Sequence, residues 1–227
     1  MKLLLVGGGG REHALAWRIR HEHPDVTLLA APGNPGIASV ASCHPVGAGD
    51  VSALVHLAID EAVDAVIVGP EAPLAAGLAD ACAARGIACF GPTAAAAQIE
   101  TSKAFAKALM RDAGVPTARA SMHTAVADAC AAARAFGAPV VIKASGLAAG
   151  KGVVVARTLD EADAAIRSML EDDLFGDAGA EVLVEEFMTG EELSLFVLTD
   201  GETVVPLPAA QDHKRVGEGD TGPNTGG

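Results

Sequence analysis

Short apolar runs alternate with helical patterns over the first ninety residues, and this alternation restricts the fold more than any other feature of the chain. The apolar runs lie at residues 2–6, 26–30, 63–68 and 87–90. The helical patterns lie between them, at residues 11–23, 51–61 and 73–85. Strands that alternate with helices are joined by right-handed crossovers, so they form a parallel sheet with helices on both faces. The sequence therefore predicts an N-terminal α/β domain of the Rossmann-like, parallel-sheet kind.

The pattern changes near residue 100. Helices are predicted at residues 103–113, 125–136 and 159–170, and strands at 140–143, 153–156, 182–186, 193–199 and 203–207. A glycine-rich segment joins the first two of these strands, and a short connection of this kind forms a hairpin. The second region is therefore predicted to be α+β with an antiparallel sheet.

Composition excludes several classes of protein. Half of the 227 residues are hydrophobic and mean hydropathy is +0.34, which rules out intrinsic disorder. The net charge of −13 argues against a nucleic-acid partner, because such a partner needs basic residues to neutralise its phosphates. No apolar run reaches the roughly 20 residues that span a bilayer, so no membrane association is expected.

The four cysteines, Cys43, Cys82, Cys89 and Cys130, lie far apart and in apolar surroundings. No pair has the spacing of a metal site. We therefore interpret them as buried, reduced thiols rather than metal ligands, which predicts a reducing, cytoplasmic location.

Four consecutive glycines, at residues 7–10, separate the first predicted strand from the first predicted helix. Backbone N–H groups at such a turn, together with the helix dipole, favour an anion such as a phosphate. The dinucleotide fingerprint does not fit, because it would need glycine at Glu12 or His13, and no acidic residue ends the second strand. Two interpretations stay open: a tight turn without a ligand, and a phosphate site, which four glycines favour.

A second glycine-rich segment follows Lys143. It differs from a Walker P-loop, because only three residues separate Gly146 from Gly150, and Gly152 stands where Ser or Thr would bind magnesium. A hairpin that folds over nucleotide phosphates fits this pattern, and a surface hairpin with solvated lysines is the alternative. Lys143 ends an apolar strand, where an unpaired ammonium is costly, and this favours a charged partner.

Two later segments concentrate charge. Residues 185–194 carry four carboxylates between two predicted strands, which fits either a solvated acidic turn or a ligand site. Residues 211–215 place an acid, an imidazole and two cations beside the glycine-rich end of the sequence. This density indicates a site for a charged ligand.

Seven of these segments occur in one order over the whole chain. They lie at residues 7–14 (GGGGREHA), 69–74 (GPEAPL), 90–93 (FGPT), 102–105 (SKAF), 143–155, 185–194 and 211–227. In this order they closely resemble the phosphoribosylamine–glycine ligase (glycinamide ribonucleotide synthetase) family of de novo purine biosynthesis. Each motif alone is a weak signal, whereas the ordered set is specific.

The resemblance implies an ATP-grasp enzyme. Residues 1–101 would form a Rossmann-like substrate domain, and residues 102–227 an incomplete ATP-grasp domain with a lid at about 116–187. The implied reaction joins glycine to 5-phosphoribosylamine and converts ATP to ADP and phosphate through glycyl phosphate. The implied cofactors are ATP with Mg²⁺ or Mn²⁺, which with the lysines offset charge on the transferred phosphoryl group.

Site residues follow from the same resemblance, motif by motif. Those implied to bind ATP are Lys103, Lys143, Gly146, Gly150, Lys151, Gly152, Glu185, Phe187 and Glu192. The lysines would meet the phosphates, Glu185 and Phe187 the adenine, largely through backbone groups, and Glu192 the ribose. Those implied to bind substrate are Gly8, Gly9, Gly10, Arg11, Asn34, Gly36, Glu71 and Gly226. Asp212, Lys214 and Asn224 would border glycine and the phosphoryl-transfer zone.

The chain departs from the family pattern in two ways. Ser145 stands where the family usually has Asp, which leaves the lysines intact. The family's magnesium-binding Glu and Asn are expected beyond Gly227, so the chain is interpreted as truncated and is expected to fold without catalysing. We expect a monomer or a weak homo-oligomer, with self-association through the last strands.

Two other functions are compatible with parts of the pattern. Another ATP-grasp carboxylate–amine ligase, such as a biotin carboxylase, would share the clamp and the lysines but not the motif at residues 7–14. A non-catalytic nucleotide-binding fragment would bind ATP without turnover.

Overall fold

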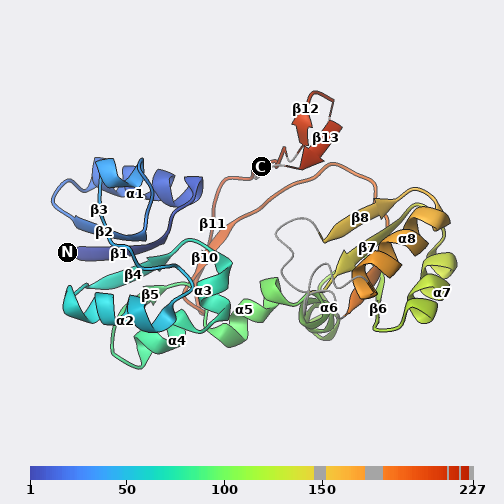
Figure 1. Ribbon diagram of the computed structural model, residues 1–227, viewed down its shortest axis with the longest axis horizontal. Helices are drawn as coiled ribbons and strands as arrows, with labels where there is room; N and C mark the ends of the chain where they lie inside the picture. The colour runs from blue at the N-terminus through green and yellow to red at the C-terminus, as the bar shows by residue number, and fades with distance from the viewer. Residues whose placement is uncertain (146–151, 172–180, 214, 220, 225–227) are drawn as a thin grey trace. The chain divides into compact units, whose positions relative to one another are not determined.

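The computed structural model describes residues 1–145, 152–171, 181–213, 215–219 and 221–224 (Figure 1). The chain divides into two compact units, Met1–Pro116 and Thr117–Gly227, and each is described by itself. None of the described helices is both long enough and apolar enough to cross a lipid bilayer.

The first unit is built on a five-stranded parallel sheet in the order β3-β2-β1-β4-β5. Its strands are β1 (Lys2–Gly7), β2 (Thr27–Pro32), β3 (Ser42–Cys43), β4 (Ala65–Val68) and β5 (Ala88–Phe90). Its helices are α1 (Gly10–Glu22), η1 (Ile37–Ser39), α2 (Val51–Asp60), α3 (Glu71–Ala75), α4 (Leu78–Ala83), α5 (Ala94–Thr101) and α6 (Lys103–Asp112). The predicted parallel sheet is confirmed.

Alternate residues of β1 serve two separate cores. Leu3 and Leu5 pack with residues of α1 and η1, whereas Leu4 and Val6 pack with residues of α2, α3 and α4. Figure 1 shows α1 on one side of the sheet and α2 on the other. A strand buried on both faces needs a continuous apolar run, which explains why residues 2–6 contain no polar side chain after Lys2.

One predicted helix of the first unit is divided. The pattern at residues 73–85 predicts one helix, but the structure has α3 and α4 with Gly77 between them at φ 89°. Glycine adopts this left-handed conformation at little cost, so it ends α3 and lets the chain turn before α4 begins.

The second unit contains a four-stranded antiparallel sheet in the order β6-β9-β7-β8. Its strands are β6 (Ala120–His123), β7 (Val140–Ala144), β8 (Val153–Ala156) and β9 (Val182–Glu186). The helices α7 (Val126–Phe136) and α8 (Leu159–Leu170) pack against one face of this sheet. The predicted hairpin between residues 140–143 and 153–156 is confirmed, with Lys143 opposite Val153.

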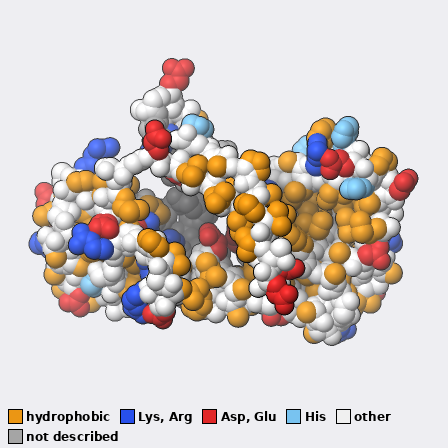
Figure 2. Space-filling view, turned by 180° about the vertical axis from the view of Figure 1, so that it is seen from behind, with side chains coloured by type: hydrophobic (Ala, Val, Ile, Leu, Met, Phe, Trp, Pro, Cys, Tyr) orange, Lys and Arg blue, Asp and Glu red, His pale blue; other side chains and the backbone are white. Residues whose placement is uncertain are grey.

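The last part of the chain forms two small hairpins. They are β10 (Val197–Thr199) with β11 (Val204–Pro206), and β12 (Arg215–Gly217) with β13 (Thr221–Asn224). Apolar side chains reach the surface here, among them Leu195, Phe196 and Val205. Figure 2 shows that hydrophobic side chains reach the surface in several patches on the face that it displays.

Candidate functional site

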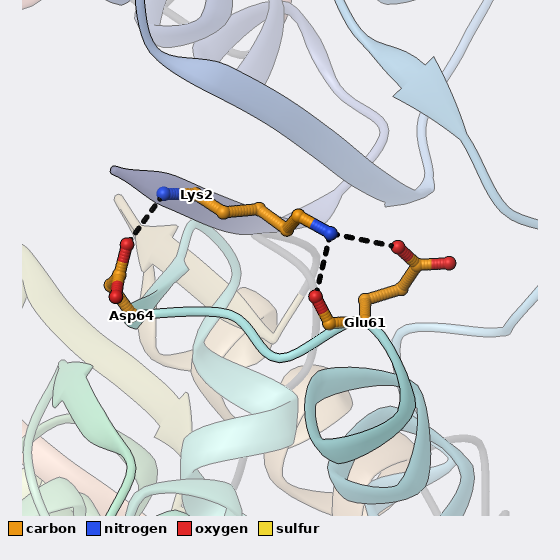
Figure 3. Close-up of polar contacts among 3 residues, drawn as sticks. All are labelled: Lys2, Glu61 and Asp64. Atoms are coloured by element: carbon orange, nitrogen blue, oxygen red, sulfur yellow. Dashed lines mark hydrogen bonds and ion pairs between the residues drawn. The ribbon is translucent and has the colours of Figure 1, made fainter.

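The two ends of β1 have different roles. At the start of the strand, the backbone N–H of Lys2 donates to Asp64 Oδ2 (2.7 Å), and its Nζ donates to the carbonyl oxygen of Glu61 (2.7 Å) and to Glu61 Oε2 (3.2 Å) (Figure 3). These contacts hold the start of β1 against the turn that precedes β4. Lys2 is therefore a structural cation, and the residues predicted to bind a ligand lie at the opposite, carboxyl end of the strands.

The glycine loop (residues 7–10) connects β1 to α1 at that end. Gly7 has φ 127°, a backbone conformation that favours glycine, and Gly9 is the N-cap of α1. The carboxylate of Glu12, in the first turn of α1, accepts a hydrogen bond from the Gly9 N–H (2.6 Å). Glu12 is only 5% exposed, so this carboxylate lies inside the turn. The Gly9 N–H is therefore already hydrogen-bonded within the protein.

Close packing explains why glycines occur here. A Cβ at Gly7 would lie 2.7 Å from Glu12 Cγ, and a Cβ at Gly9 would lie 2.9 Å from Glu12 Oε2. A Cβ at Gly69, after β4, would overlap Glu12 Oε1. The carboxylate thus occupies space that side chains at three glycine positions would otherwise fill.

The turn after β2 is tied to the glycine loop. Asn34 Nδ2 donates to the carbonyl oxygen of Gly8 (2.9 Å), and Asn34 Oδ1 accepts from the Ile37 N–H (2.8 Å). A Cβ at Gly36 would overlap the His13 ring. Asn34 therefore fixes the distance between two turns that are far apart in sequence.

Arg11 connects the glycine loop to the end of β4. Its Nη1 donates to the carbonyl oxygen of Gly69 (3.0 Å) and to Glu71 Oε1 (3.2 Å). In the order β3-β2-β1-β4-β5, the chain leaves β1 toward β2 and later returns to the other side of β1 as β4. Ligands of open α/β sheets bind at the carboxyl ends of the strands where the order reverses in this way. Arg11 spans this switch point.

Most of the predicted substrate residues thus meet at one edge of the first unit. They are Gly8, Gly9, Gly10, Arg11, Asn34, Gly36 and Glu71. Gly226 lies outside the described residues. Sequence reasoning did not single out Glu12 or Gly69 as site residues. The spacing of Glu12, three residues after the N-cap glycine, is the signal of a capping box and could have identified it.

Lys143 is paired in the second unit. Its Nζ forms an ion pair with Glu185 Oε2 of the neighbouring strand β9, and the side chains are 28% and 7% exposed. The cost of an unpaired lysine at this position, expected from the sequence, is therefore avoided by a specific carboxylate. Glu185 is predicted to contact adenine through its backbone, which stays a prediction, and its side chain has the additional role of neutralising Lys143.

Strand register shows which residues share a face with this ion pair. Lys143 lies opposite Leu183 on β9 and opposite Val153 on β8, so these side chains lie on one face of the sheet. The other face carries Ile142 and Val184, which are buried against α7 and α8. Val153 and Val155 are each 43% exposed. The face without these helices thus combines apolar side chains with the Lys143–Glu185 ion pair. Apolar surface beside an ammonium group suits a nucleotide.

The remaining predicted residues have separate positions. Lys103 is the first residue of α6, in the first unit, and is half-buried. Gly152 is buried and its carbonyl oxygen accepts from the Ala144 N–H (2.8 Å), which closes the β7–β8 hairpin. Phe187 and Glu192 are exposed in the segment after β9, and Asp212 is half-buried.

Several other predicted site residues lie, wholly or by their side chains, outside the described residues. Asn224 ends β13, and its side chain lies outside the described residues, as do Gly146, Gly150, Lys151 and Lys214. Among the described residues, no three His, Cys, Asp or Glu side chains are grouped so as to hold a metal ion.

The cysteines are free thiols, but not all are buried. Cys82 and Cys130 are buried and Cys89 is half-buried, whereas Cys43 is exposed, so the prediction was wrong for Cys43. Its strand, β3, has only two residues and lies at the edge of the sheet, where one side chain faces solvent.

Comparison with known families identifies the family of the chain. Residues 1–100 match the phosphoribosylglycinamide synthetase N domain, and residues 101–227 match the ATP-grasp (A) domain of the same synthetase. The chain belongs to the phosphoribosylglycinamide synthetase family. The predicted fold class, a Rossmann-like domain followed by part of an ATP-grasp domain, is confirmed.

Individual relatives agree with this family. The phosphoribosylamine–glycine ligase of Xylella fastidiosa (strain 9a5c) is 53% identical over 229 residues, covering the whole chain and 52% of that protein. The crystal structure of phosphoribosylamine–glycine ligase from Thermotoga maritima has a TM-score of 0.84 at 29% identity, covering the whole chain and 54% of that structure.

More distant structures share only the fold. The biotin carboxylase domain of Hydrogenobacter thermophilus 2-oxoglutarate carboxylase, solved with MgADP and bicarbonate, has a TM-score of 0.73 at 23% identity, covering 92% of the chain and 49% of that structure. The chain spans about half the length of the curated relatives it matches.

Proposed function

We propose that the chain belongs to an ATP-dependent ligase that joins glycine to 5-phosphoribosylamine and gives glycinamide ribonucleotide, ADP and phosphate. The observation that carries this proposal is the position of Arg11 at the switch point of the first sheet, where its side chain joins the glycine loop to Gly69 and Glu71. The family membership and the names of the relatives supply the reaction.

The first unit would bind the sugar phosphate. Gly8, Gly9, Gly10 and Arg11 would face it from the loop after β1, with Asn34 and Gly36 after β2 and Glu71 after β4. Hydrogen bonds fix the positions of these turns before any ligand binds, so little ordering entropy would be lost on binding. We place the boundary of this domain after residue 101, and the lid at about residues 116–187.

The ATP-grasp part would bind ATP with Mg²⁺ or Mn²⁺. The fit to a nucleotide rests on the face that carries Lys143, where the Lys143–Glu185 ion pair lies beside apolar side chains. Lys103, Lys143 and Lys151 would neutralise phosphate charge, with Gly146, Gly150 and Gly152 close to the phosphates. Phe187 and Glu185 would contact adenine, and Glu192 the ribose. The metal, when bound, would stabilise charge on the transferred phosphoryl group.

Glycine would be activated as glycyl phosphate, because a carboxylate resists attack by an amine until one of its oxygens becomes a good leaving group. The residues that would lie beside the bound glycine and the transferred phosphoryl group are Asp212, Lys214, Asn224 and Gly226. We further propose a cytoplasmic protein that is a monomer or a weak homo-oligomer and has no nucleic-acid or membrane partner.

A chimera tests the proposed reaction. The chain would replace the matching half of the Xylella fastidiosa ligase, to which it is 53% identical. ADP release that needs both glycine and 5-phosphoribosylamine is the expected result. Bicarbonate-dependent release would instead indicate a carboxylase, and ATP binding without turnover in the chimera would indicate a non-catalytic nucleotide-binding protein. The chain alone is expected to bind ATP without turnover.

A further inference from the structure

Glu12 places a buried negative charge inside the loop that is proposed to bind a sugar phosphate. It is 5% exposed, its Oε2 accepts the Gly9 N–H at 2.6 Å, and its Oε1 lies against Gly69. The capping box explains the bond to Gly9. It does not explain why the carboxylate also lies beside Gly7 and Gly69, the last residue of β1 and the first after β4.

The charges gathered here are mostly negative. Arg11 brings one positive charge, and it is already bonded to Glu71. The two carboxylates of Glu12 and Glu71 carry more charge than the single guanidinium of Arg11. A phosphate placed near the inner end of the loop, beside Gly7 and Gly69, would be repelled by the Glu12 carboxylate, and this repulsion is strong where water is largely excluded.

The outer end of the loop has the opposite character. A Cβ at Gly10 would meet no heavy atom within 4 Å, so there is open space beside this residue. Gly10 is the first residue of α1, where backbone N–H groups carry the positive end of the helix dipole. The Arg11 guanidinium does not change this contrast, because its Nη1 is already bonded to the Gly69 carbonyl oxygen and to Glu71. An anion therefore fits at Gly10, at the start of α1, and does not fit beside the Glu12 carboxylate at Gly7 and Gly69.

We propose that Glu12 sets the direction in which the sugar phosphate lies on the loop. The phosphate lies toward Gly10 and the start of α1, and the end that carries the hydrogen-bond-donating amine or hydroxyl group lies toward Glu12 and Gly69. Glu12 is then a specificity-determining residue that rejects phosphate from the inner end of the loop. This inference rests on the proposed function of the first unit.

The test compares two ligands on the intact 227-residue chain. Amide resonances of the ¹⁵N-labelled protein are followed during titration with inorganic phosphate and, separately, with ribose 5-phosphate, each to about 20 mM so that millimolar Kd values are measured. The variant Glu12→Gln keeps an oxygen that can accept from Gly9 and removes the charge. The matched control is Glu22→Gln, which makes the same change of charge at the exposed end of the same helix.

Glu12→Gln is expected to bind inorganic phosphate about three- to tenfold more tightly than the wild type, because one nearby negative charge is gone. Its preference for ribose 5-phosphate over inorganic phosphate is expected to fall about tenfold, because an amide accepts a donor less strongly than a carboxylate does. Glu22→Gln should change neither value by more than about twofold at physiological salt. A role in capping alone would leave the ratio of the two Kd values unchanged.

Other outcomes separate the two levels of inference. If ribose 5-phosphate moves the glycine-loop resonances of the wild type but Glu12→Gln leaves the ratio unchanged, the role of Glu12 is refuted and the proposed site stands. If ribose 5-phosphate moves none of these resonances, the proposed site fails, and the role of Glu12 fails with it. Should Glu12→Gln not fold, Glu12→Asp keeps the charge with a shorter reach. It must then bind phosphate as weakly as the wild type and ribose 5-phosphate more weakly, or the inference is overturned.

Discussion

Lys143 illustrates how far reasoning from single residues reaches. Its position at the end of an apolar strand predicts a charged partner, and the structure provides Glu185. The sequence did not identify that partner, because Glu185 is 42 residues away and lies within an acidic segment that also fits a solvated turn. Only the register of β7 with β9 brings the two side chains together.

This pairing changes what a substitution of Lys143 should do. Lys143→Met is expected to weaken ATP binding and also to lower the free energy of unfolding by about 2–3 kcal/mol, because it removes the ammonium group that pairs with the buried Glu185 carboxylate. Isothermal titration with ATP and urea unfolding measure the two effects. The double variant Lys143→Met, Glu185→Gln should recover most of the stability but not the ATP affinity. If Lys143→Met has the ATP affinity and the free energy of unfolding of the wild type, Lys143 is excluded from the site.

The glycine loop offers a matched pair of substitutions. A Cβ at Gly8 would lie 2.6 Å from the carbonyl oxygen of Gly33, whereas a Cβ at Gly10 meets open space. Gly8→Ala should therefore destabilise the protein by about 1–3 kcal/mol through a backbone shift. Gly10→Ala should be neutral or stabilising by up to about 1 kcal/mol, because alanine is the better helix former. Thermal unfolding of the two variants checks this order, and equal stabilities would contradict it.

Gly9 needs a different explanation from the one that its sequence context suggests. The sequence allows a positive φ at this position, but the structure gives −87°, which any residue adopts. What restricts Gly9 is the Glu12 carboxylate, 2.9 Å from the position of a Cβ. Contacts of this kind depend on a side chain from the next helical turn and cannot be read from a run of glycines.

At the level of elements, long apolar runs were predicted well and short polar ones were missed. The runs that became β1, β2, β4 and β7 are nearly continuous in apolar residues, as expected of buried strands. The strand β6 (Ala-Ser-Met-His) was missed, because it is an edge strand with a polar residue at every second position. The hairpin β12–β13 was not predicted, because glycines and charges dominate residues 215–224.

The last two strands are shorter in the structure than the sequence predicts. The pattern at residues 193–199 predicts a full strand, but pairing with β11 begins only at Val197, and Ser194 makes a single bridge to Ala210. β-propensity alone does not fix strand length, because pairing requires a partner in register.

The contact between α4 and β5 makes the stability of the first unit sensitive to alkaline pH. Burial raises the pKa of the Cys82 thiol, and burial together with the neighbouring Cys82 thiol raises the pKa of Cys89 to about 12. In the unfolded chain these thiols would titrate near 9.0. The folded protein therefore holds protons that the unfolded chain loses, so stability is full below pH 9 and falls as pH rises from 9 toward 12.

Urea midpoints measured between pH 8 and about 11 test this dependence. The wild-type midpoint should fall above pH 9, and Cys89→Ala should flatten the fall. Cys43→Ala is the matched control, because Cys43 is exposed and should leave the slope unchanged. The chain has no tyrosine, so no phenol titrates in this range. Identical slopes for the wild type and Cys89→Ala would disprove the assignment.

At the scale of the whole molecule, the described units differ in how completely they bury their apolar residues. The first unit has two cores, one on each face of its sheet. In the second unit the core lies on the face covered by α7 and α8, while apolar side chains after β9 stay exposed. The fold class followed from the sequence, because strand–helix alternation marks the first ninety residues and the motif order extends over the whole chain. The exposed apolar surface after β9 was expected for one reason. The last predicted strands, at residues 193–199 and 203–207, had no predicted helix to cover them.

The exposed apolar segment after β9 should cause the 227-residue chain to self-associate. Phe196 is 59% exposed and Val205 is 51% exposed, on or beside the two-stranded hairpin β10–β11. Apolar patches and unpaired strand edges favour association. Sedimentation velocity over a range of concentrations should show oligomers of the wild type. The double variant Phe196→Ser, Val205→Thr should weaken association at least about tenfold, equivalent to about 1.4 kcal/mol. Ile59→Ser removes an exposed apolar side chain of the first unit and should leave association unchanged. A wild-type chain that stays monomeric at every concentration, or an Ile59→Ser variant as strongly affected as the double variant, would show that this segment does not drive association.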